Sequence, residues 1–106
     1  MLKSIINLTP HAITIVMESG NIVVPPSGVV ARRSENTVTI GMVEGIPIVK
    51  KVFGVVENLP DPVEGIIYIT SALVGAEVKR ADVMSPGDPV RDEHGRVIGC
   101  KTLCSF

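Results

Sequence analysis

The chain has 106 residues, of which 45% are hydrophobic, with ten Lys or Arg, eleven Asp or Glu and a formal net charge of -1. This length fits one domain with a modest core, and the balanced charge excludes a global field that would draw the chain onto nucleic acid or an anionic membrane. One Tyr, two Phe and no Trp are too few aromatic rings for a platform that stacks the bases of a single strand.

Short apolar runs rich in Val and Ile alternate with Gly, Pro and Asn along the chain. Because β-branched side chains pack well on a pleated surface, this pattern predicts a compact β-rich domain. The first strands are expected over residues 4–8 and 12–16, with a bend between them at residues 9–11. Residues 18–21 are predicted to form a turn, from which residues 22–24 return as a hairpin partner.

Two further strands are predicted over residues 29–33 and 37–41, on either side of a polar turn at residues 34–36. The sequence Val-Glu-Gly-Ile-Pro-Ile-Val at 43–49 is echoed by Val-Glu-Gly-Ile-Ile-Tyr-Ile at 63–69. A repeat protein would need several copies, so we interpret this pair as two strands that each begin after a Glu-Gly turn. The proline-containing residues 58–62 are expected to form a stiff connector between them.

One helix is predicted near residues 71–80, because Thr70 or Ser71 can cap a segment whose apolar side chains follow helical spacing. Gly75 weakens this helix by about 1 kcal/mol relative to alanine. The predicted fold class is therefore α+β: a single small domain over residues 1–106, mostly antiparallel or mixed β-sheet, for which a barrel-like sheet is one arrangement. Residues 80–88 are expected to form a loop that leads from the helix into a last hairpin.

The last hairpin lies in Val-Arg-Asp-Glu-His-Gly-Arg-Val-Ile-Gly-Cys at 90–100. A type I turn at 92–95, with Gly95 in the left-handed position, predicts a three-residue hairpin. In this register Val90 lies opposite Ile98, and Asp92 lies opposite Arg96, where a cross-strand ion pair is worth roughly 0.2–1 kcal/mol. The hairpin turn therefore accounts for much of the charge in this segment.

Cys100 and Cys104 are four residues apart, so on one strand they share a face at roughly 13 Å and cannot bond to each other. Cys100 is expected to pack as a small apolar residue, and no paired spacing of His and Cys predicts a metal site. The first sixteen residues are too polar for a signal peptide or a membrane span. We therefore expect a cytoplasmic protein, in the host cell cytoplasm if the chain is phage-encoded.

Three stretches carry a resemblance to a known family: Asn-Leu-Thr-Pro-His-Ala-Ile-Thr-Ile at 7–15, the segment 43–62, and the tail 68–100 with its Arg-Asp-x-x-Gly-Arg-x-x-Gly-Cys motif. Together they cover most of the chain, which resembles a family of small proteins found in bacteriophage and actinobacterial genomes. The resemblance implies a genome context and supplies no catalytic residues. In that context, a small accessory protein is expected to counter host defence by sequestering a nucleotide signal.

The expected function is therefore that of a homo-oligomeric anti-defence sponge, which sequesters a small phosphorylated host signal such as a cyclic or ADP-ribose-type nucleotide. No catalysis, cofactor, nucleic acid polymer or membrane is expected to take part. Arginines for the phosphates and hydroxyl or backbone donors for the rest of the ligand would line such a pocket. The candidate ligand-binding residues are Arg91, Arg80, Arg33, Ser71, His11 and Ser85. The alternatives are a protein–protein interaction module or inhibitor of a host protein, and a small nucleotide-processing enzyme.

Ordinary structural roles compete with ligand binding at several of these positions. Arg32 and Arg33 point to opposite sides of a strand, so at most one of them can enter any one pocket, and both can serve as solvated edge charges. Ser71 can act as a helix cap, and His11 can be a plain turn residue. Arg91 has no assigned acidic partner, which makes it the strongest candidate for contact with an anion.

Overall fold

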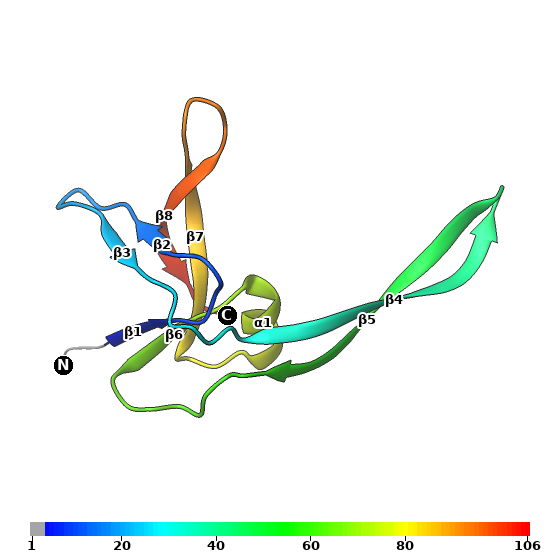
Figure 1. The fold of residues 1–106 in the computed structure, drawn as a ribbon, viewed down its shortest axis with the longest axis horizontal. Helices are drawn as coiled ribbons and strands as arrows, with labels where there is room; N and C mark the ends of the chain where they lie inside the picture. Colours follow the sequence, from blue (N-terminus) through cyan, green and yellow to red (C-terminus); the bar gives the residue numbers. More distant parts are fainter. Residues whose placement is uncertain (1–3) are drawn as a thin grey trace.

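The computed structural model describes residues 4–106 as eight strands and one short helix (Figure 1). Six strands form one sheet, which we call the body, and the other two form a separate hairpin, which we call the arm. In chain order the elements are β1 (Ser4–Asn7), β2 (Ile13–Ile15), β3 (Ile22–Val24), β4 (Arg32–Val43), β5 (Ile46–Glu57), β6 (Ile66–Ile69), α1 (Ala72–Val78), β7 (Val83–Arg91) and β8 (Val97–Cys104).

The body is a mixed sheet in the order β1-β6-β7-β8-β2-β3. The pairs β1–β6, β6–β7 and β2–β8 are parallel, and β7–β8 and β2–β3 are antiparallel. The two ends of the sheet meet just after β3, where Asn7 bridges Pro26 and the N–H of Ser27 donates to the carbonyl of Asn7 at 3.0 Å. The fold is thus mostly β with a nearly closed, barrel-like sheet, and with only one short helix it fits the α+β class loosely.

The helix α1 crosses over between the parallel neighbours β6 and β7, a connection that parallel strands require. It begins where predicted, because the Ser71 hydroxyl accepts a hydrogen bond from the N–H of Val74 at 3.4 Å. It ends at Lys79, whose backbone is left-handed at φ 48° and whose N–H donates to the carbonyl of Gly75. The predicted helix near residues 71–80 is therefore confirmed, with its ends inside that range.

Two small apolar clusters hold the body together. The first lies under α1 and contains Leu8, Ala31, Tyr68, Val74 and Val83. The second contains Ile15, Val24 and Cys100, in and around the β2–β8 pairing. Burial of each such side chain stabilises the fold by about 1.5–3 kcal/mol.

The Glu-Gly turns lie where the sequence predicts them. β5 begins directly after Gly45 and β6 directly after Gly65, and both glycines have a positive φ, 78° and 83°. The two resembling segments are therefore separate strands in different sheets. The connector at residues 58–62 also contains no strand or helix, as expected.

The prediction of two short strands around a polar turn at residues 34–36 is wrong. β4 runs without interruption from Arg32 to Val43, and residues 34–36 lie inside it. Ser34, Glu35 and Asn36 are all exposed, because the strand leaves the body at this point and water surrounds it. Polar side chains are tolerated in a strand that has no buried face, so here polarity does not mark a turn.

The prediction that residues 80–88 form a loop is also wrong, since β7 begins at Val83. Pro86 and Pro89 lie inside the strand, opposite Leu103 and Cys100 of β8. β7 pairs with β6 only at Val83 and Met84, so both prolines lie where β7 has a single hydrogen-bonding neighbour. A proline without an N–H is tolerated at such an edge.

The hairpin turn at residues 92–95 is confirmed, because the N–H of Gly95 donates to the carbonyl of Asp92 at 3.0 Å and Gly95 has φ 79°. The predicted register holds next to the turn, where Arg91 pairs with Val97 and the N–H of Asp92 donates to the carbonyl of Arg96 at 2.9 Å. Beyond a bulge it is wrong by one residue, since Val90 lies opposite Gly99. The expected ion pair of Asp92 with Arg96 is absent from the described residues. Instead, Oδ1 of Asp92 accepts the backbone N–H groups of His94 and Arg96 at 2.8 and 2.9 Å.

The Asn-Leu-Thr-Pro-His motif closes the barrel. Asn7 is 1% exposed, and its Nδ2 donates to the carbonyls of His11 and Val24 at 2.7 and 3.0 Å. Its Oδ1 accepts from the N–H and hydroxyl of Thr9 at 2.9 and 2.6 Å. One amide side chain therefore holds the turn after β1 and ties that turn to the end of β3.

We expect Asn7→Ala to lower the free energy of unfolding by about 2 kcal/mol or more, because a buried acceptor that loses its partner costs about 1–3 kcal/mol. Urea denaturation followed by the fluorescence of Tyr68, the single tyrosine, measures the loss. Asn21→Ala is the control, since Asn21 is exposed and should change the stability by less than about 0.5 kcal/mol. Equal effects of the two variants would contradict the closing role of Asn7.

Candidate functional site

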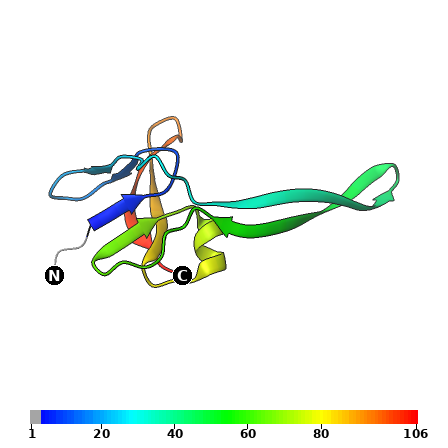
Figure 2. The same ribbon diagram turned by 60° about the horizontal axis from the view of Figure 1, so that its bottom comes forward.

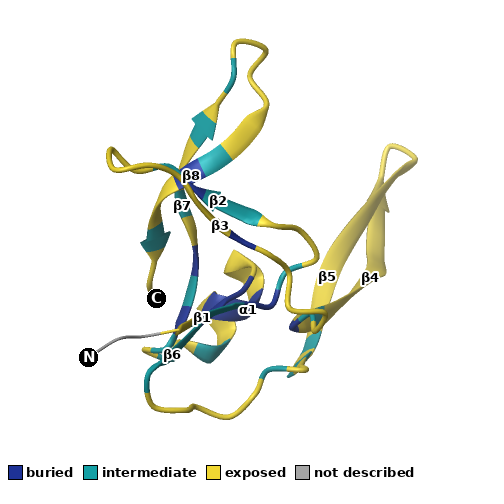
Figure 3. Cartoon of the chain, turned by 60° about the vertical axis from the view of Figure 1, so that its left-hand side comes forward, coloured by how far each residue is buried: buried dark blue, intermediate teal, exposed yellow. Residues whose placement is uncertain are grey.

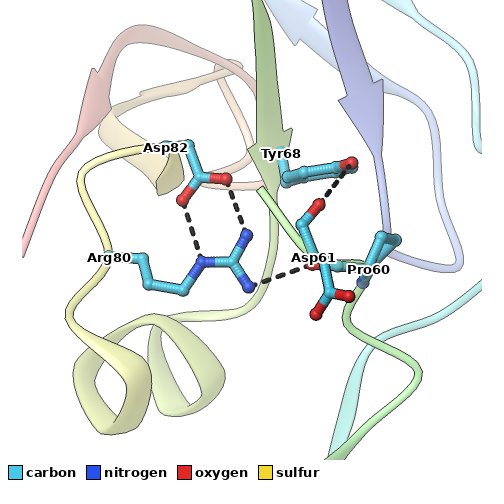
Figure 4. Close-up of polar contacts among 5 residues, drawn as sticks. All are labelled: Pro60, Asp61, Tyr68, Arg80 and Asp82. Atoms are coloured by element: carbon cyan, nitrogen blue, oxygen red, sulfur yellow. Dashed lines mark hydrogen bonds and ion pairs between the residues drawn. The ribbon is translucent and has the colours of Figure 1, made fainter. Parts of the chain in front are cut away.

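Arg80 holds the connector onto the body (Figure 4). Its Nε and one terminal nitrogen donate to the two carboxylate oxygens of Asp82 at 2.9 and 2.6 Å, and the other terminal nitrogen donates to the carbonyl of Pro60 at 3.0 Å. The hydroxyl of Tyr68 adds a longer contact to the carbonyl of Asp61 at 3.4 Å. These contacts give Arg80 a structural role and occupy its guanidinium.

Arg80 and Asp82 stabilise each other's charged forms. The hydrogen bond to Arg80 holds the pKa of Asp82 below its ordinary value, and the hydrogen bond to Asp82 raises the pKa of Arg80. Burial opposes both shifts but is the smaller cause in each case. The two side chains are 24% and 20% exposed, so solvent screens their attraction only in part.

Arg33 braces the base of the arm. Its guanidinium lies 3.2 Å from the carboxylate of Glu77 in α1, and its Nε donates to the carbonyl of Gly54 at 3.2 Å. The same guanidinium stacks over the ring of Phe53 at 4.7 Å from the centroid, an arrangement worth about 0.5–1 kcal/mol at an exposed site. Arg33 is thus engaged within its own chain, whereas its neighbour Arg32 is exposed.

The two candidate serines also have structural partners. Ser71 caps α1, as described above. Ser85 is 5% exposed and lies inside β7 opposite Cys104. Both therefore contribute to the body, and neither shares a pocket with Arg80, whose guanidinium faces the connector (Figure 4).

Arg91 and His11 remain exposed. One terminal nitrogen of Arg91 donates to the carbonyl of Gly95 at 2.8 Å, which orients the guanidinium and leaves its other N–H groups unused among the described residues. Nearly the whole of β7 separates Arg91 from Arg80, and at about 3.3 Å per residue a nine-residue strand spans roughly 30 Å. One copy of the chain therefore does not bring these two arginines into one pocket.

An apolar hollow of about 250 Å³ lies between β2 and β8. Neither Arg91 nor His11 lines this hollow, although Arg91 is the register partner of Val97, which does, and His11 directly precedes Ala12 in the chain. The hollow is lined by Ala12, Ile13, Thr14, Pro86, Val97, Ile98, Gly99 and Cys100. The sequence analysis missed this hollow, because it forms where two strands far apart in the chain pair in parallel.

Cys100 at the floor of this hollow is 4% exposed, and burial raises the pKa of its thiol. Its thiolate is therefore disfavoured near neutral pH, and the residue packs as a small apolar side chain, as predicted. Cys104 lies on the same strand and is also a free thiol. In residues 4–106, no three His, Cys, Asp or Glu side chains lie close enough together to hold a metal ion.

The arm is the second feature that the sequence did not reveal. Figure 3 shows it exposed along almost its whole length. Ten of the nineteen large hydrophobic side chains that are exposed in the described residues belong to β4 and β5. They are Val38, Ile40, Met42, Val43, Ile46, Ile48, Val49, Val52, Phe53 and Val55.

A second hollow, of about 520 Å³, opens at the base of the arm. Its polar groups are Arg32, Glu57 and Asn58, and the amide of Asn58 donates to the carbonyl of Val30 at 3.3 Å. Gly28, Val29 and Val30 form the rest of its wall. The exposed Arg32 therefore lies in a hollow at the base of the arm, whose surface is largely apolar.

The chain was compared with protein-family models, curated proteins and solved structures, and no match was found in any of the three. None of the helical residues described here forms a stretch long and apolar enough to cross a membrane.

We expect Asp82→Asn to lower the free energy of unfolding near neutral pH by about 1–3 kcal/mol, the cost of losing hydrogen bonds to a charged group. The pKa of Asp82 is lower in the folded chain than the value of about 3.9 in an unfolded chain, so the pair stabilises the fold above that value. This stabilisation is lost as the pH falls through the folded pKa. The difference between wild type and variant should therefore shrink in acid.

Urea denaturation monitored by Tyr68 fluorescence between about pH 7 and pH 3 measures this difference. Asp61→Asn is the matched control, because the Asp61 carboxylate is exposed and forms no hydrogen bond among the described residues. A constant difference between wild type and Asp82→Asn across this range would show that the ion pair does not stabilise the fold.

Proposed function

We propose that the chain is a phage-encoded, non-catalytic binding protein, which works as a homo-oligomer and sequesters a small phosphorylated host signal such as a cyclic or ADP-ribose-type nucleotide. The observation that supports the proposal is the apolar hollow between β2 and β8, one of whose lining residues, Val97, is the register partner of the exposed Arg91. An apolar floor suits the base or sugar face of a nucleotide, and a guanidinium suits its phosphate.

The size of this hollow supports a ligand that is only partly enclosed by one copy. Its volume of about 250 Å³ lies just below the range of about 300–1,000 Å³ that small-molecule sites occupy. The other candidate arginines, Arg33 and Arg80, are engaged with Glu77 and Asp82. Additional phosphate contacts would therefore come from a second copy, which is why the proposal includes homo-oligomers.

Thermal unfolding in the presence of a panel of cyclic and ADP-ribose-type nucleotides tests this function. A ligand at 100 times its dissociation constant should stabilise the protein by about 2.7 kcal/mol. No stabilisation by any member of the panel would contradict the proposal. Chromatography of the incubated ligand distinguishes sequestration, in which it is recovered intact, from turnover.

We expect Arg91→Ala to weaken binding of the stabilising nucleotide by at least about tenfold, because a charge-assisted hydrogen bond is worth about 1.5–3 kcal/mol. Isothermal calorimetry measures the change. Arg32→Ala is the matched control, since Arg32 is an exposed arginine that lies in the other hollow, at the base of the arm. Equal losses for the two variants would show that the chain attracts the ligand only by its general charge.

A protein–protein interaction module, or an inhibitor of a host protein, is the second candidate function. The arm favours it, because an exposed apolar surface of this extent marks a site of association. Affinity capture from a host lysate tests this candidate. A single host protein recovered in stoichiometric amount, together with no response to nucleotides, would favour it over sequestration.

A further inference from the structure

The strand pairing of the arm is interrupted by a bulge near its base. Gly54 and Val55 of β5 lie opposite Ser34 alone, so the register of the two strands shifts by one residue at this point. A bulge bends its strand and leaves one residue without a partner in the ladder. Gly54 has no side chain, and Val55 is 76% exposed. The bulge is therefore a place where little side-chain packing opposes bending.

The two sides of the bulge differ in how firmly they are attached to the body. On the body side, Ala31 is buried in the first apolar cluster and Val56 packs against that cluster. Beyond the bulge, residues 35–53 form no hydrogen bond or ion pair with the body among the described residues. Figures 1 and 2 show that the arm extends away from the body in both views. The outer arm is thus attached to the body through its base alone.

The shape of the whole chain reflects this arrangement. The radius of gyration is 16.9 Å, against about 13 Å for a compact chain of this length. Each strand of the arm has twelve residues, so a small change of angle at the base moves the tip a long way.

Arg33 is the side chain that reaches across the bulge. Its backbone lies on the body side, opposite Val56. Its guanidinium lies 3.2 Å from the carboxylate of Glu77 in α1, and its Nε donates to the carbonyl of Gly54 at 3.2 Å. The guanidinium also stacks over the ring of Phe53, just beyond the bulge, at 4.7 Å from the centroid. One side chain therefore contacts the body, the bulge and the outer arm together.

We propose that the bulge at Gly54 and Val55 is a hinge of the arm, and that Arg33, held by Glu77, restrains it. Hinge motion requires a few residues that absorb a change in φ and ψ, and a bulge that contains a glycine provides them. With the contacts of Arg33 in place, the arm points in one direction. Without them it bends at its base, and its exposed apolar side chains point in other directions relative to the body.

The ion pair that holds Arg33 can be weakened by salt. The side chains of Arg33 and Glu77 are 18% and 51% exposed, so solvent and ions screen their attraction in part. The direction of the arm should therefore become less well defined as the ionic strength rises.

A second bulge of the arm lies near its tip, where Ile40 separates the paired residues Thr39 and Gly41. Bending at this bulge would move only the end of the arm. The bulge at the base is therefore the one that sets the direction of the arm as a whole.

Pulsed electron paramagnetic resonance measures the distance between a spin label near the tip of the arm and one on the body. The labels are attached to Met42→Cys in β4 and Lys101→Cys in β8, both exposed positions. The exposed Cys104 is replaced by serine, and the buried Cys100 is left in place. Dilution with an excess of unlabelled chain ensures that each measured distance lies within one copy.

We expect one narrow distance distribution for the otherwise unchanged chain at low salt. Arg33→Ala removes all three contacts, and it should raise the ratio of arms outside the main distance peak to arms within it at least about tenfold. Glu77→Gln removes the ion pair only, and it should raise the same ratio about two- to fivefold. High salt should broaden the distribution of the unchanged chain in the same direction.

Glu35→Gln is the matched control. It removes an ion pair of similar length, with Lys51 at 3.0 Å, which lies entirely within the outer arm. Because this pair does not join the arm to the body, its loss should leave the distance distribution unchanged. Equal broadening by Glu35→Gln and Glu77→Gln would show that the arm loosens along its length and has no hinge at its base.

Two further outcomes would overturn the proposal. A distribution for the unchanged chain as broad as that for Arg33→Ala would show that Arg33 does not restrain the arm. A narrow distribution for every variant would show that the bulge is not a hinge. Tyr68 is 2% exposed in the body, so its fluorescence shows whether the body of each variant is folded. If Arg33→Ala unfolds the body, the comparison of Glu77→Gln with Glu35→Gln decides.

This inference does not rest on the proposed function, since its test uses neither a nucleotide nor a second copy of the chain. A restrained hinge without a nucleotide response would contradict sequestration alone. A nucleotide response from a chain with a rigid arm would contradict the hinge alone.

Discussion

The structure depends on the constraint that its long apolar hairpin cannot bury its side chains within its own chain. β4 and β5 together account for a large part of the sequence, and the two small clusters of the body lie away from most of that length. Only the base of the hairpin reaches the core, through Val56 and the neighbouring Leu59. Near the base Arg33 also covers the ring of Phe53, and beyond it the apolar side chains of the arm lie exposed to water.

The remainder of the chain forms a firm attachment for this arm. Asn7 closes the sheet by donating to the carbonyls of His11, in the turn after β1, and Val24, at the end of β3. Arg80 fastens the connector that follows β5. Arg33 joins β4 to α1 through Glu77. Hydrogen bonds and ion pairs of polar side chains therefore contribute much of the stability of the body. Its apolar clusters are small, as expected for a domain of this size.

The same arrangement keeps the candidate arginines apart within one copy. Arg33 and Arg80 are used for structure, and Arg91 lies at the far end of β7, opposite Val97.

The sequence by itself determined the local features, because these depend on residues close together in the chain. The cap at Ser71, the Glu-Gly turns before β5 and β6, and the turn at residues 92–95 were all predicted from neighbouring residues and are present. The barrel-like sheet was one of the arrangements that the strand pattern allowed. The Asn-Leu-Thr-Pro-His motif was noticed as a pattern, but its role in closing the sheet was not.

Only the tertiary structure decided which polar side chains form hydrogen bonds or ion pairs within the chain and which strands are exposed. The sequence favoured Arg91 because it had no assigned acidic partner, and the packing of α1, the connector and the arm engages Arg33 and Arg80, whereas Arg91 donates only to the carbonyl of Gly95 among the described residues. Residues 34–36 resembled a turn because polarity usually marks one, yet in a strand surrounded by water no buried face selects against polar side chains. The contacts of Arg33 with Glu77 and of Arg80 with Pro60 join segments distant in the chain, so no local pattern could reveal them.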